Sequence, residues 1–126
     1  MLKTKIIGRK NPNDREAPPK YYAAAVHEVT TDLNKLAVDV SNRCTIRRSD
    51  VVGVLLALMD VIPEHLADGK MISLGELGTL CVNVQSEGSE TVEDFLPSMV
   101  IGKKIVFRPT KELRDKVQLF KVSLAV

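Results

Sequence analysis

One stretch in the middle of the chain constrains the fold more than any other: residues 50–69, DVVGVLLALMDVIPEHLADG. Placed at helical spacing, its apolar side chains cover nearly the whole circumference of a helix. A chain of 126 residues has too few other apolar segments to bury such a helix by itself. We therefore expect a second copy of the chain to cover part of the helix surface, in a homodimer.

The ends of this helix carry local signals. Ser49 is a favourable N-cap residue, and Gly69 is typical of the position that ends a helix. Pro63 removes one helical hydrogen bond, so we expect a bend near it and no break.

Strands are predicted on both sides of the helix. Residues 2–10 alternate charged and apolar side chains, and residues 21–30 can pair with them across the proline-containing connection 11–19. Three alanines in 21–30 would also suit a helix. Residues 70–84 and 99–109 are rich in β-formers, and each predicts one strand.

Two shorter helices complete the prediction. Thr30 or Thr31 caps a short amphipathic helix that has Asp32 in its first turn. Thr110 caps a second helix, which is expected to reach at least Phe120.

The residue types that carry chemistry are sparse. Cys44 and Cys81 lack C-x-x-C spacing, so we expect both to be buried reduced thiols. His27 and His65 have no partner at metal-ligand spacing. No nucleophile with a base, carboxylate pair or metal cluster can be assembled. We expect no enzyme activity, no cofactor, no metal and no small-molecule substrate. With no long apolar run, the chain is expected to be soluble and cytoplasmic, without a membrane partner.

Charge is distributed unevenly along the chain, whose net charge is +2. Residues 1–20 carry +4 and residues 98–126 carry +5, whereas residues 21–84 carry −3 and residues 85–97 carry −4. Basic ends around an acidic middle suggest a polyanionic partner, although ordinary solvated faces would show the same charges.

Two glycines, Gly75 and Gly78, lie three apart within a run of β-formers. Such a pair can cradle a phosphate, bend a strand or admit another backbone. A phosphate loop leads from a strand into a helix, but here another strand-like run follows and no Lys-Ser/Thr pair is present. Nucleotide binding is therefore disfavoured.

Two motifs resemble the bacterial histone-like DNA-binding proteins, HU and integration host factor. Residues 66–84, LADGKMISLGELGTLCVNV, are similar to the family's L-x-G-F-G-T-F segment, and the matching residues are Leu74, Leu77, Gly78, Thr79 and Leu80. Leu replaces both Phe, and Glu76 replaces the first Gly. In the family this segment turns over the dimer core, which favours close backbone packing as the role of Gly78.

The second motif is FRPTKELRDKV, residues 107–117, which resembles F-x-x-G-K-x-L-K-D-x-V. Its matching residues are Lys111, Leu113, Arg114, Asp115 and Val117, and Thr110 replaces the family's Gly. The resemblance covers about residues 31–118. The N-terminal residues resemble those of HU-related proteins that carry an extension before the first helix.

The resemblance implies an α+β fold of the HU/IHF type. Two chains would intertwine into a dimer with a helical base, an antiparallel sheet and protruding β-arms, here with extra N-terminal strands. Residues 1–29 would form an N-terminal extension, a β-hairpin packed on the domain, and residues 30–126 the HU/IHF-like domain. The implied function is architectural: a nucleoid-associated protein that binds and condenses duplex DNA with little sequence preference.

The resemblance, together with the positions of the basic residues, also indicates which residues contact DNA. The expected DNA-binding residues are Lys103, Lys104, Arg108, Lys111, Arg114 and Thr79, with Lys3 and Lys5 from the N-terminal strand.

The expected arm departs from the family pattern. Residues 85–99, QSEGSETVEDFLPSM, hold four acids and no base, and Pro97 lacks the Arg-Asn that precedes the family's wedging proline. We do not assign the wedge role to Pro97. The alternative function is therefore an HU-like protein-interaction module with an acidic arm and weak or no DNA binding.

Overall fold

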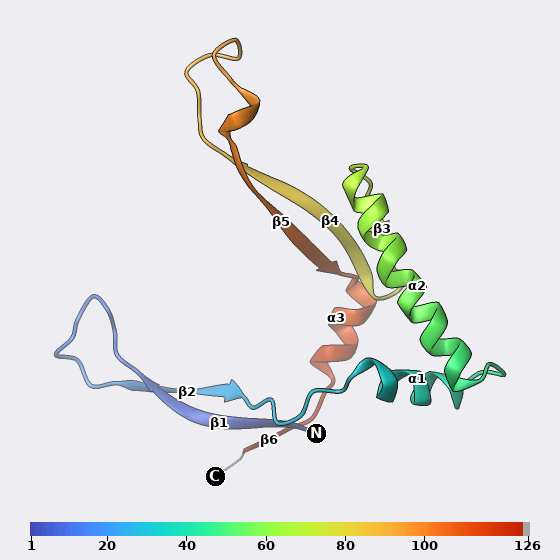
Figure 1. The fold of residues 1–126 in the computed structure, drawn as a ribbon. Helices are drawn as coiled ribbons and strands as arrows, with labels where there is room; N and C mark the ends of the chain where they lie inside the picture. Colours follow the sequence, from blue (N-terminus) through green and yellow to red (C-terminus); the bar gives the residue numbers. More distant parts are fainter. Residues whose placement is uncertain (125–126) are drawn as a thin grey trace. The chain divides into compact units, whose positions relative to one another are not determined.

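The computed structural model describes residues 1–124, and Figure 1 shows its elements along the chain. The described part is a mixed α+β structure with three α-helices and two three-stranded sheets. It divides into two compact units. The first comprises Met1–Asp32 and the residues from Lys116 onward, and the second comprises Leu33–Asp115.

The first unit is a sheet with the strand order β2-β1-β6. β1 (Leu2–Arg9) pairs antiparallel with β2 (Lys20–Ala25) and parallel with β6 (Val122–Leu124). The two predicted N-terminal strands are confirmed. The alternative of a helix in residues 21–30 is wrong, because β2 makes its backbone hydrogen bonds with β1.

In the second unit, α1 (Leu33–Ser41) precedes the long helix α2 (Arg48–Ala67). α1 begins after Asp32, so this residue does not lie in its first turn as predicted. α2 runs unbroken through Pro63, as expected.

The predicted N-cap of α2 is wrong. Arg47 occupies that position without a side-chain cap, and Ser49 lies inside the helix. A favourable cap contributes only about 1 kcal/mol, so the helix can begin one residue before the best capping side chain.

The end of α2 is confirmed as a glycine stop. Gly69 has φ +78°, and its N–H donates to the carbonyl oxygen of Leu66 at 3.0 Å. The N–H of Lys70 reaches the carbonyl oxygen of His65 at 3.2 Å. This pair of bonds is the Schellman motif, which satisfies carbonyl groups that the helix leaves without partners.

The second sheet has the order β3-β4-β5, with all neighbours antiparallel: β3 is Ile72–Ser73, β4 is Gly78–Ser86 and β5 is Val100–Pro109. The prediction of one strand over residues 70–84 is wrong. A tight turn interrupts it, where Gly75 has φ +63° and the N–H of Leu74 donates to the carbonyl oxygen of Gly78 at 2.8 Å. β4 and β5 form a long ribbon, visible in Figure 1, whose connection includes the 3-10 turn η1 (Pro97–Met99).

Gly78 is confirmed as a site of close packing. A Cβ atom there would lie 2.7 Å from Cε2 of Phe107 and would also collide with the backbone carbonyl oxygen of Arg108. The first of the two glycines therefore forms the turn, and the second lets β4 and β5 approach each other.

Replacing Gly78 with alanine is expected to lower the free energy of unfolding by about 1 to 3 kcal/mol, the usual cost of forcing an extra carbon into a packed site. Gly88 is the matched control, because no atom beyond its two chain neighbours lies within 4 Å of a Cβ built there. Gly88→Ala should change the free energy of unfolding by less than about 0.5 kcal/mol. Equal effects in urea denaturation would contradict the assignment of Gly78.

The last helix, α3 (Lys111–Gln118), begins with the predicted cap: the N–H of Leu113 donates to Oγ1 of Thr110 at 3.2 Å. The helix ends two residues before Phe120, so its predicted length is slightly too great. β6 follows, and the sequence analysis did not predict it, because three residues are too few to show a strand pattern.

A single chain buries little apolar surface. Among the described residues, Ala37 and Val51 are the only buried hydrophobic side chains, and Val54 on α2 remains 63% exposed. Both cysteines are free, and Cys81 is half-buried, but Cys44 is exposed in the turn between α1 and α2. The prediction of a buried thiol is therefore wrong for Cys44.

Candidate functional site

The pairing of β4 with β5 sorts their side chains onto two faces. Residues that pair directly across antiparallel strands share a face, and successive residues alternate. The pairs are Thr79 with Arg108, Cys81 with Val106, Asn83 with Lys104, and Gln85 with Gly102. We call this side of the ribbon the polar face.

The opposite side is the apolar face. Its pairs are Leu80 with Phe107, Val82 with Ile105, and Val84 with Lys103. Its one charged residue is Lys103, which lies near the end of the ribbon where β4 and β5 are connected. The faces differ because polar and apolar residues alternate in β4, GTLCVNVQS, as expected for a strand with two different surroundings.

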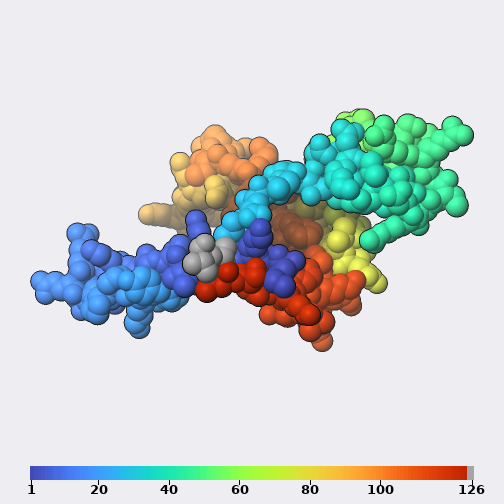
Figure 2. All heavy atoms as spheres, turned by 90° about the horizontal axis from the view of Figure 1, so that it is seen from below, coloured from blue at the N-terminus to red at the C-terminus, as the bar shows by residue number. Residues whose placement is uncertain are grey.

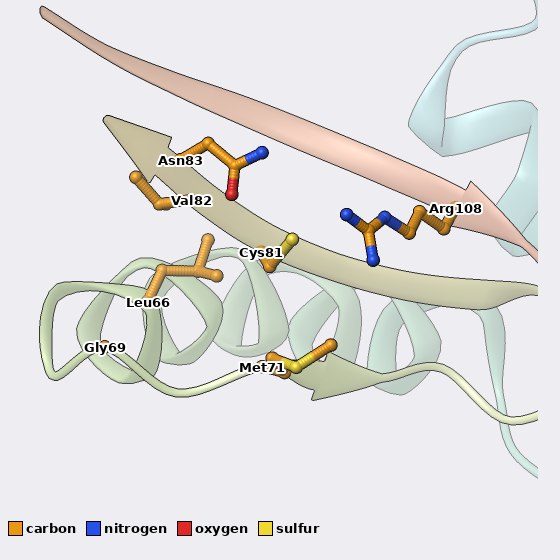
Figure 3. A pocket seen from close by; sticks show the side chains of 7 residues that line it. All are labelled: Leu66, Gly69, Met71, Cys81, Val82, Asn83 and Arg108. Atoms are coloured by element: carbon orange, nitrogen blue, oxygen red, sulfur yellow. The ribbon is translucent and has the colours of Figure 1, made fainter. Parts of the chain in front are cut away.

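Figure 3 shows a hollow of about 290 Å³ that three residues of the polar face help to line: Cys81 and Asn83 on β4, and Arg108 on β5. Val82 of the apolar face also lines it, together with Leu66, Gly69 and Met71 at and after the end of α2. Arg108 and Lys104 are exposed, whereas Thr79 is half-buried. The face thus offers two cationic side chains beside neutral hydrogen-bonding groups.

Thr110 fixes the first turn of α3 to the turn that precedes β4. Its N–H donates to the carbonyl oxygen of Leu77 at 3.2 Å, and its hydroxyl donates to the carbonyl oxygen of Glu76. Lys111 and Arg114 lie in the helix that begins here, three residues apart on one side, and both are exposed. Thr110, which stands where the family has Gly, therefore positions two of the predicted basic residues.

The charged residues within the two strands of the ribbon are all basic. β4 and β5 contain Lys103, Lys104 and Arg108 and no acidic residue. The acids Glu87, Glu90, Glu93 and Asp94 all lie in the connection between the two strands. The ribbon is therefore basic along its strands and acidic at its tip.

The two predicted lysines of β1 belong to the other unit. Nζ of Lys3 forms an ion pair with the Glu28 carboxylate at 2.9 Å, and both side chains are about half exposed. Lys5 lies two residues further along, on the same side of β1.

The structure groups the predicted residues into separate sets. Thr79, Lys104 and Arg108 share the polar face, Lys111 and Arg114 share one side of α3, and Lys103 lies on the apolar face. Sequence analysis missed Asn83 and Gln85. The alternation within residues 78–86 could have found them, had this segment been interpreted as a strand with one polar face.

A comparison against known families gives a match over nearly the whole chain. The model of the HU-HIG family, described as an HU domain fused to wHTH, Ig, or Glycine-rich motif, matches residues 2–123. The chain belongs to this family. The resemblance to HU is thereby confirmed, and the HU-HIG match includes β1 and β2 as well as the ribbon.

A solved structure similar to this HU-HIG chain is that of a protein from Bacteroides vulgatus ATCC 8482, described as a "Putative bacterial DNA binding protein". The TM-score is 0.67 at 13% sequence identity, which shows a shared fold. The match covers 98% of this chain and 47% of the other, so the chain spans about half the length of that protein. No curated protein matches the chain.

Two further observations concern residues 1–124. None of the helices in this part combines the length and the apolar character that crossing a bilayer requires. Nor do three His, Cys, Asp or Glu side chains in this part lie close enough together to hold a metal ion.

Proposed function

We propose that the chain is an architectural protein of the HU type that binds duplex DNA as a homodimer, with little sequence preference. The observation that carries this proposal is the polar face of the β4–β5 ribbon. There Arg108 and Lys104 are exposed and lie beside Thr79 and Asn83, which can donate hydrogen bonds. Cations and neutral donors of this kind suit phosphate oxygens, which are the same in every DNA sequence.

We propose that the first turn of α3 also contacts DNA. Lys111 and Arg114 are exposed, and the hydrogen bonds of Thr110 hold their turn near the start of β4. The N-terminal end of a helix also favours anions, because its backbone N–H groups carry a partial positive charge. We assign phosphate contacts to both residues. Lys103, Lys3 and Lys5 remain predicted contacts, and the Lys3–Glu28 ion pair must open for Lys3 to contribute.

The homodimer is proposed from the uncovered apolar surface of the second unit. The apolar face of the ribbon and the end of α2 line a hollow of about 600 Å³, which includes Leu66, Val82 and Ile105. Ile105 is 60% exposed in the single chain. Apolar surface of this extent on both helix and sheet favours a partner chain, and in an HU-like arrangement the partner's α2 and ribbon would cover it.

The acidic tip of the β4–β5 ribbon limits which part of the ribbon can contact DNA. Four carboxylates between β4 and β5 repel phosphates, so DNA contacts are proposed for the strands and α3 and not for the tip. We assign no DNA wedge to Pro97, which lies at the start of η1.

The remaining assignments follow from this function. Residues 1–29 are proposed to be an N-terminal extension and residues 30–126 the HU-like domain. The protein would act in the nucleoid, condense DNA and require neither catalysis nor a cofactor.

A salt titration against random-sequence duplex DNA tests the proposal. We expect log affinity to fall linearly with log salt concentration, with a slope of about −0.9 for each phosphate neutralised, and to vary little among sequences. Fluorescence anisotropy of a labelled duplex measures both quantities. If the unmodified protein shows no binding at low salt, DNA binding is excluded. The alternative function, an HU-like protein-interaction module with an acidic arm, would then replace it.

A further inference from the structure

The β1–β2 hairpin also has two unlike faces. On β1, Lys3, Lys5 and Arg9 alternate with Leu2, Thr4 and Ile6. Pairing places Lys20 opposite Arg9, and Tyr22 opposite Ile7. One face of the hairpin therefore carries four basic residues and one tyrosine, and Tyr21 lies on the other face, paired with Gly8.

The basic face ends in a hollow at the hairpin tip. Its volume is about 500 Å³, within the range of about 300 to 1,000 Å³ of pockets that hold small ligands. The lining includes Arg9, Lys10, Lys20 and Tyr22, with Pro12 and Pro18 supplying apolar surface. Figure 2 shows the atoms of this hairpin as blue spheres. β6 pairs with Leu2–Thr4 of β1, at the base of the hairpin and away from its tip.

The cations of the hollow are available to a ligand. Arg9, Lys10 and Lys20 are exposed, and no acidic residue is part of the lining. The nearest acids in sequence are Asp14 and Glu16, and the carboxylate of Asp14 accepts a hydrogen bond from the backbone N–H of Glu16 at 3.2 Å. Tyr22 is 50% exposed, so part of its ring is open to solvent beside these charges.

We infer that this hollow binds single-stranded nucleic acid. Arg9, Lys10 and Lys20 contact consecutive backbone phosphates, and an unpaired base stacks on Tyr22. A basic groove with an aromatic side chain is the combination that binds single strands, because every base has a face that can stack. A duplex keeps its bases stacked on one another and offers none to Tyr22. The inference rests on the proposed function in one respect, which is that the partner is a nucleic acid. Its residues belong to the first unit, whereas the polar face proposed to bind duplex DNA belongs to the second.

The test is anisotropy of a labelled oligo(dT) strand with the full chain. Arg9→Ala/Lys20→Ala should weaken binding and flatten the salt slope by up to about 1.4 units per chain, since each phosphate on a single strand contributes about 0.7. The charge-matched control is Arg43→Ala/Lys121→Ala, which removes two exposed cations outside the hollow and should leave the oligo(dT) affinity near that of the parent protein.

The tyrosines provide a second matched pair. Tyr22→Leu should lose about 1 to 3 kcal/mol of stacking, roughly a 5- to 150-fold drop in affinity, whereas Tyr21→Leu on the opposite face should lose little. The chain has two tyrosines and no tryptophan, so in a Tyr21→Phe variant tyrosine emission comes from Tyr22 alone. We expect oligo(dT) to quench that emission. This measurement leaves every residue that lines the hollow unaltered.

The outcomes separate the two proposals. Duplex binding without oligo(dT) binding, or oligo(dT) binding that neither Tyr22→Leu nor the Arg9/Lys20 variant weakens, would overturn the inference and leave the duplex function intact. If the unmodified protein binds oligo(dT) but not duplex DNA, and the Tyr22→Leu and Arg9/Lys20 variants weaken oligo(dT) binding, the duplex function is contradicted. The same result supports single-strand binding at the hollow.

Discussion

If a partner chain covers Phe107 in the proposed homodimer, replacing this residue with alanine is expected to lower the free energy of unfolding by about 3 to 5 kcal/mol, the usual cost of truncating a buried aromatic residue. In the single chain Phe107 is 48% exposed on the apolar face of the ribbon. A monomer would therefore lose only about half that amount, because half of the residue is already in water. Chemical denaturation gives the size of the loss. A melting temperature that rises with protein concentration would show that association stabilises the parent.

Val92→Ala is the matched control for this substitution. Val92 is 88% exposed in the connection between β4 and β5, so its truncation should cost less than about 0.5 kcal/mol in either oligomeric state. A folded monomer in sedimentation at micromolar concentration, with a small loss for Phe107→Ala, would exclude the proposed homodimer.

Removing Lys104 and Arg108 together is expected to produce the largest loss of duplex affinity. Both lie on the polar face, so the double alanine variant should flatten the salt slope by up to about 3.6 units in a dimer, at about 0.9 for each of four phosphates. The effect should be similar for all duplex sequences, because phosphate contacts carry no sequence information. Circular dichroism should remain unchanged, since both side chains are exposed.

Lys103→Ala is the sharpest control for the role of the face. Lys103 and Lys104 are neighbours on β5 with the same charge, but they lie on opposite faces of the ribbon. If the polar face contacts DNA, Lys104→Ala alone should weaken binding more than Lys103→Ala. Equal losses would mean that net charge near the arm, and not the face, determines affinity.

The elements that sequence analysis predicted correctly are those determined by local chemistry. Gly69 ends α2 because glycine adopts a positive φ at low cost, and Thr110 caps α3 because its hydroxyl accepts a hydrogen bond from the backbone three residues later. The tight turn before β4 was missed, because β-formers flank the turn on both sides and conceal it. β6 depends on a distant partner strand, so its own three residues do not determine it.

The candidate site was only partly predictable for a related reason. The motif similarity and the basic residues indicated which part of the chain to consider. However, the grouping of Thr79 with Arg108, and the separation of Lys103 from Lys104, depend on the register between β4 and β5. A shift of one residue exchanges the two faces of a strand, and similarity of short motifs does not establish register.

The parallel pairing of β1 with β6 affects the order of folding. The hydroxyl of Thr4 donates to the carbonyl oxygen of Ser123 at 3.0 Å, across 119 residues of chain, whereas β1 and β2 are joined by a short connection. Contacts of such high sequence separation form slowly, because a long loop must close first. During synthesis the hairpin can therefore form early, while the edge of β1 at Leu2–Thr4 keeps unpaired backbone groups until Val122–Leu124 leave the ribosome. Nascent chains are most exposed to pairing with one another at this edge until β6 pairs with it.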